Sequence, residues 1–438
     1  MCGINGIISK DKNKDKLIKS MNEKILHRGP DAEGIFVEGD VALGQRRLSI
    51  IDLAGGNQPI YNEDKSILIM YNGEVYNYKE LKEELTEYKF ETESDTEVVL
   101  HGYEKWGHNL PKKLRGMFAY AIYDKNKGEI FISRDQFGIK PLYYYHDGDT
   151  ILFGSEIKSF LACPKFKKVL NKELLGAYLT FSFTPTDETF FKGVYRLPSG
   201  HSMTIDVKKR KIKIDRYFKV EFGNTDKSFD EVVKDISTAM KDSTEHHLIS
   251  DVEVGSFLSS GVDSSYLVSL AKPDKTYTIG FDLAKYSEID YAKDLTDKLN
   301  IKNISEKISK EEYMNALSDV YYHMDEPTAD GCAIAVYFLS RLASKDVKVV
   351  LSGEGADEFF GGYNSYDDNF YTKLPFFIRK SMASICKILP KNKITRYIIR
   401  RGLPLEESYV SINRTYYDDE LKDVLKIDNY IKNKDIVK

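Results

Sequence analysis

This 438-residue sequence has no apolar run approaching the roughly 20 residues of a membrane-spanning helix, so we expect no membrane partner. It has only four cysteines, spread from Cys2 to Cys386, and its charged start (residues 9–16) has no apolar signal core. We therefore expect no disulfide framework and a reducing cytoplasm. Basic and acidic residues nearly balance, 64 against 68, so the overall charge favours neither nucleic acid nor an anionic surface.

The spacing of apolar residues differs between the two halves of the chain. Up to about residue 218, short alternating apolar runs predict strands at 4–8, 41–43, 67–71, 117–123, 129–133, 142–145 and 150–153, with helices at 17–25, 79–85 and 96–106. This pattern predicts an α+β layered domain with an antiparallel sheet.

From about residue 228, strands at 252–258, 276–281, 304–308 and 347–351 alternate with helices at 264–271, 289–299, 313–324 and 333–343. Such alternation predicts a mostly parallel, doubly wound α/β sheet. The stretch 221–227 is polar and turn-forming, so we place one domain at 1–218 and a second at 228–438.

A basic segment, residues 373–401, holds nine Lys or Arg and no acid, with apolar residues interleaved. Two basic amphipathic helices joined near Pro390 fit this pattern. A surface for nucleic acid or acidic lipid is one interpretation, and a packed helix pair with a solvated basic face is the other. We favour the packed pair, because no second basic surface accompanies it.

Cys2 would carry a free α-amino group once the initiator Met is removed, which puts a nucleophile and a base on one residue. Asn72 and Gly73 lie between two strand-like runs, where a hairpin turn is the simplest interpretation and an oxyanion hole the functional one. Arg47 and Asp95 are either surface charges or the partners of an amino-acid substrate's carboxylate and ammonium groups.

Residues 254–265 read as a strand, a small hydroxyl-rich loop and a helix, which is the geometry of an anion site; a Ser-rich capped turn is the alternative. The loop has no Gly-Lys-Ser/Thr, so it is not the ordinary P-loop. A second such stretch, 352–363, follows the strand at 347–351 and sets Glu354, Asp357 and Glu358 among glycines. These carboxylates suit Mg²⁺ or general-base work, with a glycine-rich surface turn as the alternative.

Taken together, these motifs resemble the glutamine-dependent asparagine synthetase family. The first half carries Met-Cys-Gly-Ile, His27-Arg-Gly-Pro-Asp31, Arg47-Leu-Ser-Ile50, Asn72-Gly-Glu74, Ser94-Asp95, Arg134-Asp135, Lys140-Pro-Leu-Tyr143 and Ser155-Glu156. This set is similar to the class II glutamine amidotransferases, which are N-terminal nucleophile hydrolases with an αββα sandwich. Ser259-x-Gly-x-Asp-Ser264 and Ser352-Gly-Glu-Gly-Ala-Asp-Glu358 resemble a pyrophosphate-loop, adenine nucleotide alpha hydrolase-like ATP domain.

The resemblance implies two reactions joined by ammonia. Cys2 would attack the glutamine amide while Asn72 and Gly73 hold the oxyanion. Glutamine would be bound by Arg47, Leu48, Ser49, Ile50, Ile51, Asn72, Gly73, Glu74 and Asp95. Ammonia would pass through a tunnel shielded from bulk water to the second site.

At that second site, the resemblance implies that aspartate is activated by ATP as an aspartyl adenylate. ATP and pyrophosphate would contact Phe257, Leu258, Ser259, Ser260, Gly261, Val262, Asp263, Ser264, Ser265, Ile279, Ser352 and Gly353. Asp263 and Asp357 would face Mg²⁺, and Glu354 is the candidate base for attacking ammonia. Glutamine, aspartate and ATP are thus the expected small-molecule partners, and a homodimer stays an open alternative to a monomer.

Two features depart from the family pattern. Ser260 replaces the commoner second glycine of the first loop. The family's C-terminal motifs, an Asp-Lys-Met-Ser-type segment, a Glu-x-Arg-x-Pro-Phe-Leu-Asp motif and a lysine, do not occur before Lys438, so we expect an ATP domain that is incomplete at its C-terminus. Two alternatives therefore stay open: a relative acting on another carboxylate, for which the segment 325–330 does not fix the substrate, and a shortened chain with glutaminase activity alone or a non-catalytic role.

Overall fold

The computed structural model describes residues 1–282, 287–328, 331–363, 373–390, 392–404, 415–416, 418–426 and 431. The chain forms two compact units. The first comprises Met1–Lys168, Gly193–Asp325 and Ile334–Ser352, and the second comprises Val169–Lys192, Glu326–Ala333 and Gly353–Lys438. Part of the predicted segment 325–330, namely 329–330, lies outside the described residues.

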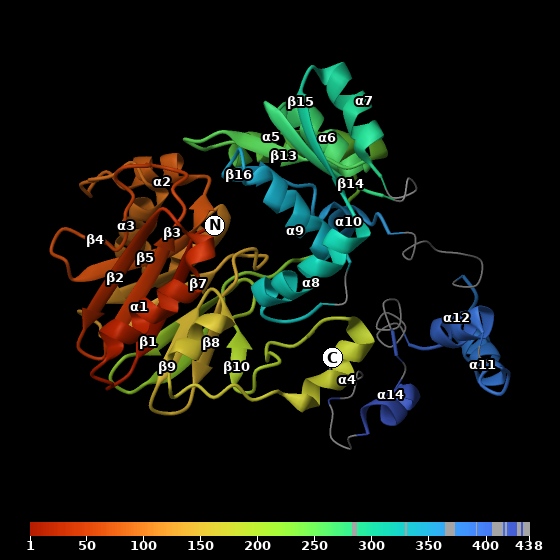
Figure 1. Cartoon of the computed structure of the whole chain (residues 1–438), viewed down its shortest axis with the longest axis horizontal. Helices are drawn as coiled ribbons and strands as arrows, with labels where there is room; N and C mark the ends of the chain where they lie inside the picture. The colour runs from red at the N-terminus through yellow and green to blue at the C-terminus, as the bar shows by residue number, and fades with distance from the viewer. Residues whose placement is uncertain are drawn as a thin grey trace. The chain divides into compact units, whose positions relative to one another are not determined.

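Two six-stranded antiparallel sheets occupy the N-terminal part of the first unit (Figure 1). The first sheet has the order β10 (Val194–Arg196), β8 (Tyr143–His146), β9 (Ile151–Gly154), β1 (Gly3–Ile8), β3 (Val41–Arg47) and β2 (Ala32–Glu38). The second has the order β12 (Lys211–Arg216), β11 (His201–Asp206), β7 (Glu129–Arg134), β6 (Gly116–Asp124), β5 (Ile67–Val75) and β4 (Ile60–Tyr61). β1 and β5 are interior strands: Cys2 directly precedes β1, and β5 contains Asn72, Gly73 and Glu74.

Helices cover the outer faces of these sheets. α1 (Lys14–Lys24) packs on β1, β2 and β3, while α3 (Asp95–Trp106) packs on β5 and on α2 (Tyr78–Glu84). Short 3₁₀ helices, η1 (Leu26–Arg28), η2 (Gly107–Lys112) and η3 (Ile157–Ala162), link these elements. The predicted αββα sandwich is therefore confirmed.

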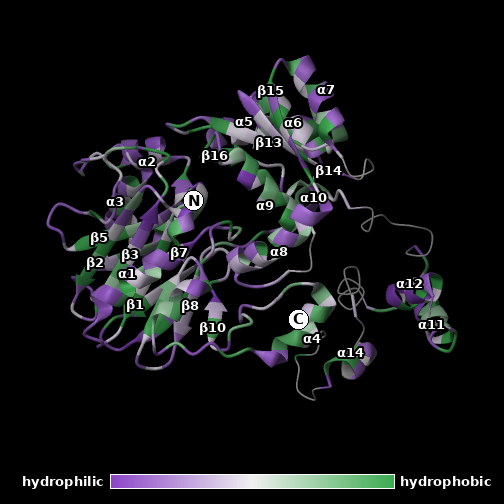
Figure 2. Cartoon of the chain, viewed as in Figure 1, coloured by the Kyte–Doolittle hydropathy of each residue, from purple (hydrophilic) through white to green (hydrophobic). Residues whose placement is uncertain are grey.

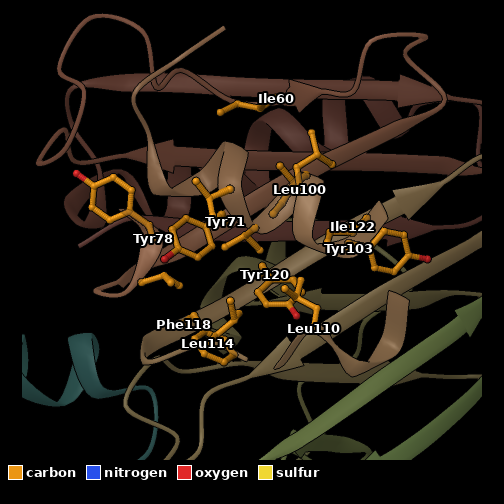
Figure 3. Close-up of a cluster of buried hydrophobic side chains, with 14 of the residues drawn as sticks. Ile60, Tyr71, Tyr78, Leu100, Tyr103, Leu110, Leu114, Phe118, Tyr120 and Ile122 are labelled. Atoms are coloured by element: carbon orange, nitrogen blue, oxygen red, sulfur yellow. The ribbon is translucent and has the colours of Figure 1, made fainter. Parts of the chain in front are cut away.

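The sandwich has one core between its sheets and another beneath α2 and α3. Successive residues of β5 alternate between them: Leu68 and Met70 lie in the inter-sheet cluster, whereas Ile69 and Tyr71 join the cluster under the helices. Figure 3 shows Tyr71 in this second cluster. Because both faces of β5 are buried, its apolar run is continuous rather than alternating with polar residues.

A buried charge cluster fixes the first turns of α3. Ser94 caps the helix by accepting a hydrogen bond from Thr96 N. Glu97 accepts hydrogen bonds from the backbone of residues 91–92, and His101 lies between Glu97 and Glu104. These contacts hold the turn that leads into Asp95, a predicted site residue.

A four-stranded parallel sheet completes the first unit, in the order β15 (Lys302–Ile308), β14 (Lys275–Phe281), β13 (Val254–Phe257) and β16 (Val349–Leu351). The helices between the strands are α6 (Val262–Ala271), α7 (Ile289–Leu299), α8 (Lys310–Met324) and α9 (Cys332–Ala343), and α5 (Phe229–His247) precedes the sheet. Capping boxes at Ser228 and Ser309 start α5 and α8. The predicted alternating α/β fold is confirmed.

The second unit contains η4 (Lys172–Leu174), α4 (Leu175–Phe181), α10 (Ala356–Phe360), α11 (Phe376–Cys386), α12 (Lys393–Arg401) and α14 (Asp418–Leu425). α11 packs against α12, with Arg379 Nη1 donating to the Arg401 carbonyl over 2.8 Å. The predicted pair of basic helices is confirmed, and hydrophilic residues dominate α12 in Figure 2. No helix in the described residues is both long and apolar enough to cross a membrane.

Candidate functional site

Cys2 lies directly before β1; the backbone of Leu48 holds its side chain, and the side chain of Arg28 holds its carbonyl. Leu48 N–H donates to Cys2 Sγ over 3.3 Å, and the thiol donates to the Leu48 carbonyl over 3.5 Å. Arg28 Nε donates to the Cys2 carbonyl over 2.9 Å. A Cβ on the neighbouring Gly3 would lie 2.8 Å from Ile25 Cδ1, so the end of the Ile25 side chain would have to shift. The predicted nucleophile is therefore fixed in place.

Burial shapes the ionisation of the groups around Cys2. Burial raises the pKa of the Cys2 thiol, and it lowers the pKa of the Met1 α-amino group to about 5. Burial also lowers the pKa of Lys140 to about 8, and Glu74 and Lys140 act on the thiol with opposite charges. The Cys2 thiol is therefore protonated at neutral pH and needs a base. The Met1 amine would be lost with Met1, so that base would be the α-amino group that Cys2 then carries.

Asn72 and Gly73 lie inside the nine-residue strand β5, so the hairpin interpretation of this pair is wrong. Gly73 is opposite Phe118 of β6, and a Cβ on Gly73 would lie 2.8 Å from Phe118 Cα. Both backbone groups of Phe118 bond to Asp135: the N–H donates to the side-chain oxygen Oδ2 (3.2 Å), and the carbonyl accepts from the Asp135 N–H (2.8 Å). The backbone N–H and carbonyl of Phe118 therefore point away from Gly73, so the two residues form a non-hydrogen-bonded pair. The Gly73 N–H accordingly points away from β6, to the outer edge of β5.

Side chains occupy the neighbouring N–H groups along that outer edge. Tyr71 N–H donates to Gln58 Oε1 over 2.6 Å, and Val75 N–H donates to Asp95 Oδ2 over 2.9 Å. Gly73 lies midway between them, and no side chain among the described residues accepts a hydrogen bond from its N–H. One backbone donor is thus left open on an otherwise satisfied edge.

The Asn72 side chain provides a second open donor. Its Nδ2 and Oδ1 atoms are buried, and neither has a hydrogen-bond partner within the part of the chain that the structure describes. Leaving a buried amide unpaired costs about 1–3 kcal/mol, so an amide of this kind is a ready partner for a bound group. Asn72 and Gly73 together offer the two donors that an oxyanion needs.

Two predicted glutamine-binding carboxylates lie beside this edge, Asp95 buried and Glu74 half-buried. Asp95 Oδ2 accepts hydrogen bonds from Tyr71 OH (2.7 Å) and Val75 N–H (2.9 Å). Burial raises the pKa of Asp95 and raises that of Glu74 well above its usual range, and the Asp95 charge adds to the effect on Glu74. Glu74 Oε2 is buried without a partner among the described residues. A bound cation would stabilise this pair of carboxylates.

Arg47, at the end of β3, donates to the loop that follows it. Its Nη2 donates to the carbonyls of Ile51 (3.1 Å) and Asp52 (2.6 Å), and its Nη1 donates to Asn57 Oδ1 (3.0 Å). Arg47 therefore shapes the segment 48–57, which carries the predicted site residues Leu48, Ser49, Ile50 and Ile51. Its contact with a substrate carboxylate stays a prediction.

Sequence reasoning gave no role to a chain of buried charges behind Cys2. Arg28 Nη1 donates to Glu156 Oε1 over 3.0 Å, Lys158 binds the other oxygen of Glu156, and Lys158 Nζ also pairs with Asp325 Oδ1 at 2.9 Å. Although burial raises the pKa of Glu156, hydrogen bonds from His27 and the cations lower it to about 2. The scarcity of arginine, 14 residues against 50 lysines, was the available signal for Arg28.

The hydroxyl-rich loop joins β13 to α6 and is built from its own polar groups. Ser259 Oγ and Ser264 Oγ lie 2.8 Å apart, Gly261 N–H donates to Ser259 Oγ over 3.1 Å, and Ser265 Oγ donates to the Gly261 carbonyl over 2.8 Å. Ser260, Gly261, Val262 and Asp263 are exposed where α6 begins. Ser260, the departure from the family pattern, donates to Glu288 Oε1 over 2.8 Å.

The predicted adenine contacts lie at the carboxyl ends of β13 and β14. Leu258 and Ile279 are buried, in two different apolar clusters, and Phe257 packs against a third. The structure does not bring these three side chains into one cluster, and their contact with adenine stays a prediction.

The second motif begins where β16 ends. β13 and β16 are adjacent, and the strand order reverses at this pair, which is where open α/β sheets bind ligands. Ser352 belongs to the first unit, whereas Gly353, Glu354 and Asp357 belong to the second, in which Asp357 lies on α10. Among the described residues, no group of three or more His, Cys, Asp or Glu is arranged to hold a metal ion.

Both halves of the chain match known families. A glutamine amidotransferase domain family matches residues 1–218, and an asparagine synthase family matches residues 235–426. Asparagine synthetase [glutamine-hydrolyzing] 1 of Bacillus subtilis is 41% identical over 97% of this chain and 70% of its own length. A putative asparagine synthetase 2 of Methanocaldococcus jannaschii is 35% identical over 99% of this chain and 90% of its own length.

Other relatives are longer or more distant. A putative asparagine synthetase of Mycobacterium tuberculosis is 37% identical over 91% of this chain, which spans 65% of that relative's length. Among solved structures, a glutamine phosphoribosylpyrophosphate amidotransferase of B. subtilis covers 69% of this chain and 65% of its own, with 17% identity. Its TM-score of 0.38 is too low to support an argument about this chain.

Proposed function

Because the chain belongs to the family of glutamine-hydrolysing asparagine synthetases, we propose that it transfers the amide nitrogen of glutamine, as ammonia, to ATP-activated aspartate. The products are asparagine, glutamate, AMP and pyrophosphate. The observation that carries this proposal is the pair of unpartnered donors at Asn72 and Gly73, in the same sandwich as the fixed Cys2 thiol.

Glutamine hydrolysis begins once Met1 is removed and Cys2 carries the α-amino group. The amine takes the thiol proton, and the thiolate attacks the amide carbon of glutamine. Asn72 Nδ2 and Gly73 N–H donate to the oxygen that becomes negative, and the amine returns its proton to the leaving ammonia. Water then cleaves the thioester, which releases glutamate and restores the thiol. An oxyanion hole is worth about 10²–10³ in kcat per donor.

The substrate's charges fit the buried groups beside this centre. We place the glutamine α-ammonium against Asp95 and Glu74, because a cation would stabilise two carboxylates that burial holds at raised pKa values. We assign the α-carboxylate to Arg47 and to the backbone of 48–51, which Arg47 shapes.

Aspartate activation belongs to the parallel sheet. The aspartate β-carboxylate attacks the α-phosphorus of ATP and pyrophosphate leaves; ammonia then attacks the acyl carbon and AMP leaves. The backbone N–H groups of the exposed residues that begin α6, with the hydroxyls of Ser259, Ser260, Ser264 and Ser265, bind the pyrophosphate. Phe257, Leu258, Ile279 and the backbone of Ser352 and Gly353 hold adenine, and Glu354 accepts the proton of the attacking ammonia.

Asp263 and Asp357 would supply carboxylate oxygens to Mg²⁺, the kind of ligand that this ion prefers. Asp263 is exposed in the first turn of α6, beside the anion loop, so its chemistry and position fit such a role. Bound Mg²⁺ would offset the negative charge of the triphosphate.

Comparison of two nitrogen donors tests the function. With glutamine, ATP and aspartate, the wild-type protein should produce asparagine and glutamate, and Cys2→Ala should produce neither. With ammonia in place of glutamine, Cys2→Ala should still make asparagine. Cys163→Ala, which alters a buried thiol on the same sandwich, is the matched control. Unchanged glutamate release by Cys2→Ala would contradict the proposal.

The acceptor is tested separately, because this chain spans only 65–70% of the length of two of these bacterial relatives. Pyrophosphate exchange into ATP that depends on aspartate supports asparagine synthesis. Exchange that depends on another carboxylic acid, or glutamine hydrolysis without exchange, favours the alternatives.

The remaining assignments concern the setting of the enzyme. We propose that it works in the cytoplasm on small molecules, without nucleic acid, membrane or resident cofactor other than Mg²⁺. Light scattering of the full chain distinguishes a homodimer from a monomer.

A further inference from the structure

The loop beside Cys2 is bonded to the segment that leads into the parallel sheet. Asp251 Oδ2 accepts a hydrogen bond from Asp52 N–H over 2.8 Å, and Asp251 N–H donates to the Ile50 carbonyl over 3.1 Å. Ile249 packs against the same apolar cluster as Ile50. All of these residues lie in the first unit. Two hydrogen bonds therefore join Asp251 to the loop 48–52, and one apolar cluster lies against both Ile249 and Ile50.

A second connection reaches the same loop from a different strand. Lys348 Nζ donates to Asp31 Oδ2 over 2.6 Å, and the same oxygen accepts the Ser49 N–H over 2.9 Å. Although burial raises the pKa of Asp31, these two hydrogen bonds lower it overall, so the carboxylate stays ionised. Lys348 thus bonds to the loop through one carboxylate.

The opposite side of the loop holds the nucleophile. Both backbone groups of Leu48 are hydrogen-bonded to Cys2 Sγ. Asp52 has a φ of 48°, in the left-handed region that favours glycine, and Arg47 Nη2 donates to its carbonyl. A residue in this conformation persists only where its surroundings fix it, so the Asp251 contact helps to determine the shape of the loop.

Asp251 and Lys348, which make these two connections, precede neighbouring strands of the parallel sheet. Asp251 is three residues before β13 and Lys348 directly precedes β16, and these strands are parallel neighbours with Val254 opposite Val349. Their carboxyl ends lead to the loop at Ser259 and to the motif that begins at Ser352. One pair of short strands therefore has the glutamine loop at its amino end and both ATP motifs at its carboxyl end.

We propose that Asp251 and Lys348 are positioning residues that tie the loop 48–52 to the β13–β16 pair, so that ATP binding at one end of the strands orders the glutamine loop at the other. The inference rests on the proposed function and adds the route by which its two halves communicate. The two strands, of three and four residues, connect the residues bonded to the loop 48–52 with the two ATP motifs, and contiguous packed elements of this kind can carry coupling between sites.

Simple docking of the two domains is the competing explanation, and the chain offers a control for it. Arg115 of the sandwich pairs with Asp242 of α5, and both side chains are exposed. This ion pair joins the same two domains without touching the loop 48–52. Asp242→Ala therefore weakens docking alone, whereas Asp251→Ala also releases the loop.

Three variants of the full chain separate these explanations. Asp251→Ala should raise the KM for glutamine about fivefold, because one backbone N–H of the loop loses its acceptor. Asp251→Asn keeps an acceptor oxygen and should restore the wild-type KM, and Asp242→Ala should match the wild type. Asparagine synthesis from ammonia should be unchanged in all three. A wild-type KM for Asp251→Ala, or an equal rise for Asp242→Ala, would overturn the inference.

Amide hydrogen exchange supplies a readout that needs no turnover. ATP with Mg²⁺ should slow exchange of the amides of residues 48–52 several-fold in the wild type and leave it unchanged in Asp251→Ala; Lys348→Met should give an intermediate response. Exchange that ignores ATP in the wild type contradicts the proposed communication. A wild-type protein that does not hydrolyse glutamine contradicts the proposed function, and exchange alone then decides the inference.

Discussion

Cys2 and the loop 259–265, the two reactive parts of the first unit, are held in place in opposite ways. The contacts of Cys2 come from distant parts of the sequence, the backbone of Leu48 and the buried side chain of Arg28. The loop 259–265 is held mostly by hydrogen bonds among its own residues, and four of its members are exposed. The nucleophile thus depends on the whole sandwich, whereas the anion loop depends on local hydroxyl groups.

The difference follows from the chemistry that each loop is proposed to perform. A tetrahedral oxyanion exists only briefly, near the transition state, so its hydrogen-bond donors must already be in place and shielded from water. A pyrophosphate group is a stable anion that arrives from solution, and small exposed residues at a helix start let its oxygens approach the backbone. We therefore expect substitutions near Cys2 to be costly and those in the loop to be mild.

The largest effect should come from Asn72→Ala. Loss of the unpartnered amide removes one donor to the oxyanion, so kcat for glutamine hydrolysis should fall about 10²–10³-fold, or about 2.7–4 kcal/mol, with little change in KM. Steady-state release of glutamate measures it. Asn77→Ala, at the start of α2, is the control: this half-buried amide is bonded to the backbone of Lys113 and Arg115 rather than left open. An Asn72→Ala variant with full activity would mean that the buried amide is only structural.

The next effect concerns stability. Gly73→Ala places a Cβ 2.8 Å from Phe118 Cα, so β5 and β6 must separate, at a cost of about 1–3 kcal/mol in the free energy of unfolding. Urea denaturation should show an earlier midpoint for the sandwich. Gly223→Ala adds a Cβ with nothing within 4 Å and should leave the midpoint unchanged. Equal midpoints for both variants would show that β6 adjusts without cost.

These two positions also show how far sequence reasoning reaches. The alternation of apolar residues predicted both fold classes, and most elements lie within a few residues of their predicted ranges. The pair Asn72-Gly73 predicted a turn by local pattern, yet it lies inside β5, because the requirement for glycine comes from β6, more than forty residues away in the chain. A local pattern carries no record of such a distant approach.

The site divides in the same way. Cys2, Asn72 and the serine loop carry chemistry that their residue types reveal, so the sequence could nominate them. The partners Arg28, Glu156, Lys158 and Asp325 connect through side chains that meet only in the folded chain. Arg47 was expected to bind a substrate, and the structure adds that it holds its own loop.

A smaller effect should follow from Ser264→Ala. The hydroxyl lies 2.8 Å from Ser259 Oγ and 3.2 Å from Ser259 N, so its loss loosens the loop and removes one donor to pyrophosphate. The KM for ATP should rise about fivefold, or about 1 kcal/mol. Ser269→Ala, farther along α6, is the matched control. Glutamine hydrolysis measured without ATP should not change, and a fall in both activities would contradict the local character of this loop.

The smallest effect is a pH dependence of the unfolding free energy of the sandwich that contains Cys2. Burial lowers the pKa of His101, but its contacts with Glu104 (2.7 Å) and Glu97 (3.6 Å) raise it overall to about 9, against about 6.5 in the unfolded chain. A raised folded pKa gives stability that is fully present below about pH 6.5 and is lost as pH rises through about 9.

His101→Gln should therefore remove a decline in unfolding free energy on the order of 1 kcal/mol between pH 6.5 and 9, measured by urea denaturation across that range. His201→Gln, on β11, keeps the decline because His201 is a member of neither carboxylate pair. Because His101 steadies the turn before Asp95, the same titration should weaken glutamine binding and leave the KM for ATP unchanged. If the KM for ATP rose with pH in parallel with the KM for glutamine, the glutamine site and the loop 259–265 would not be independent.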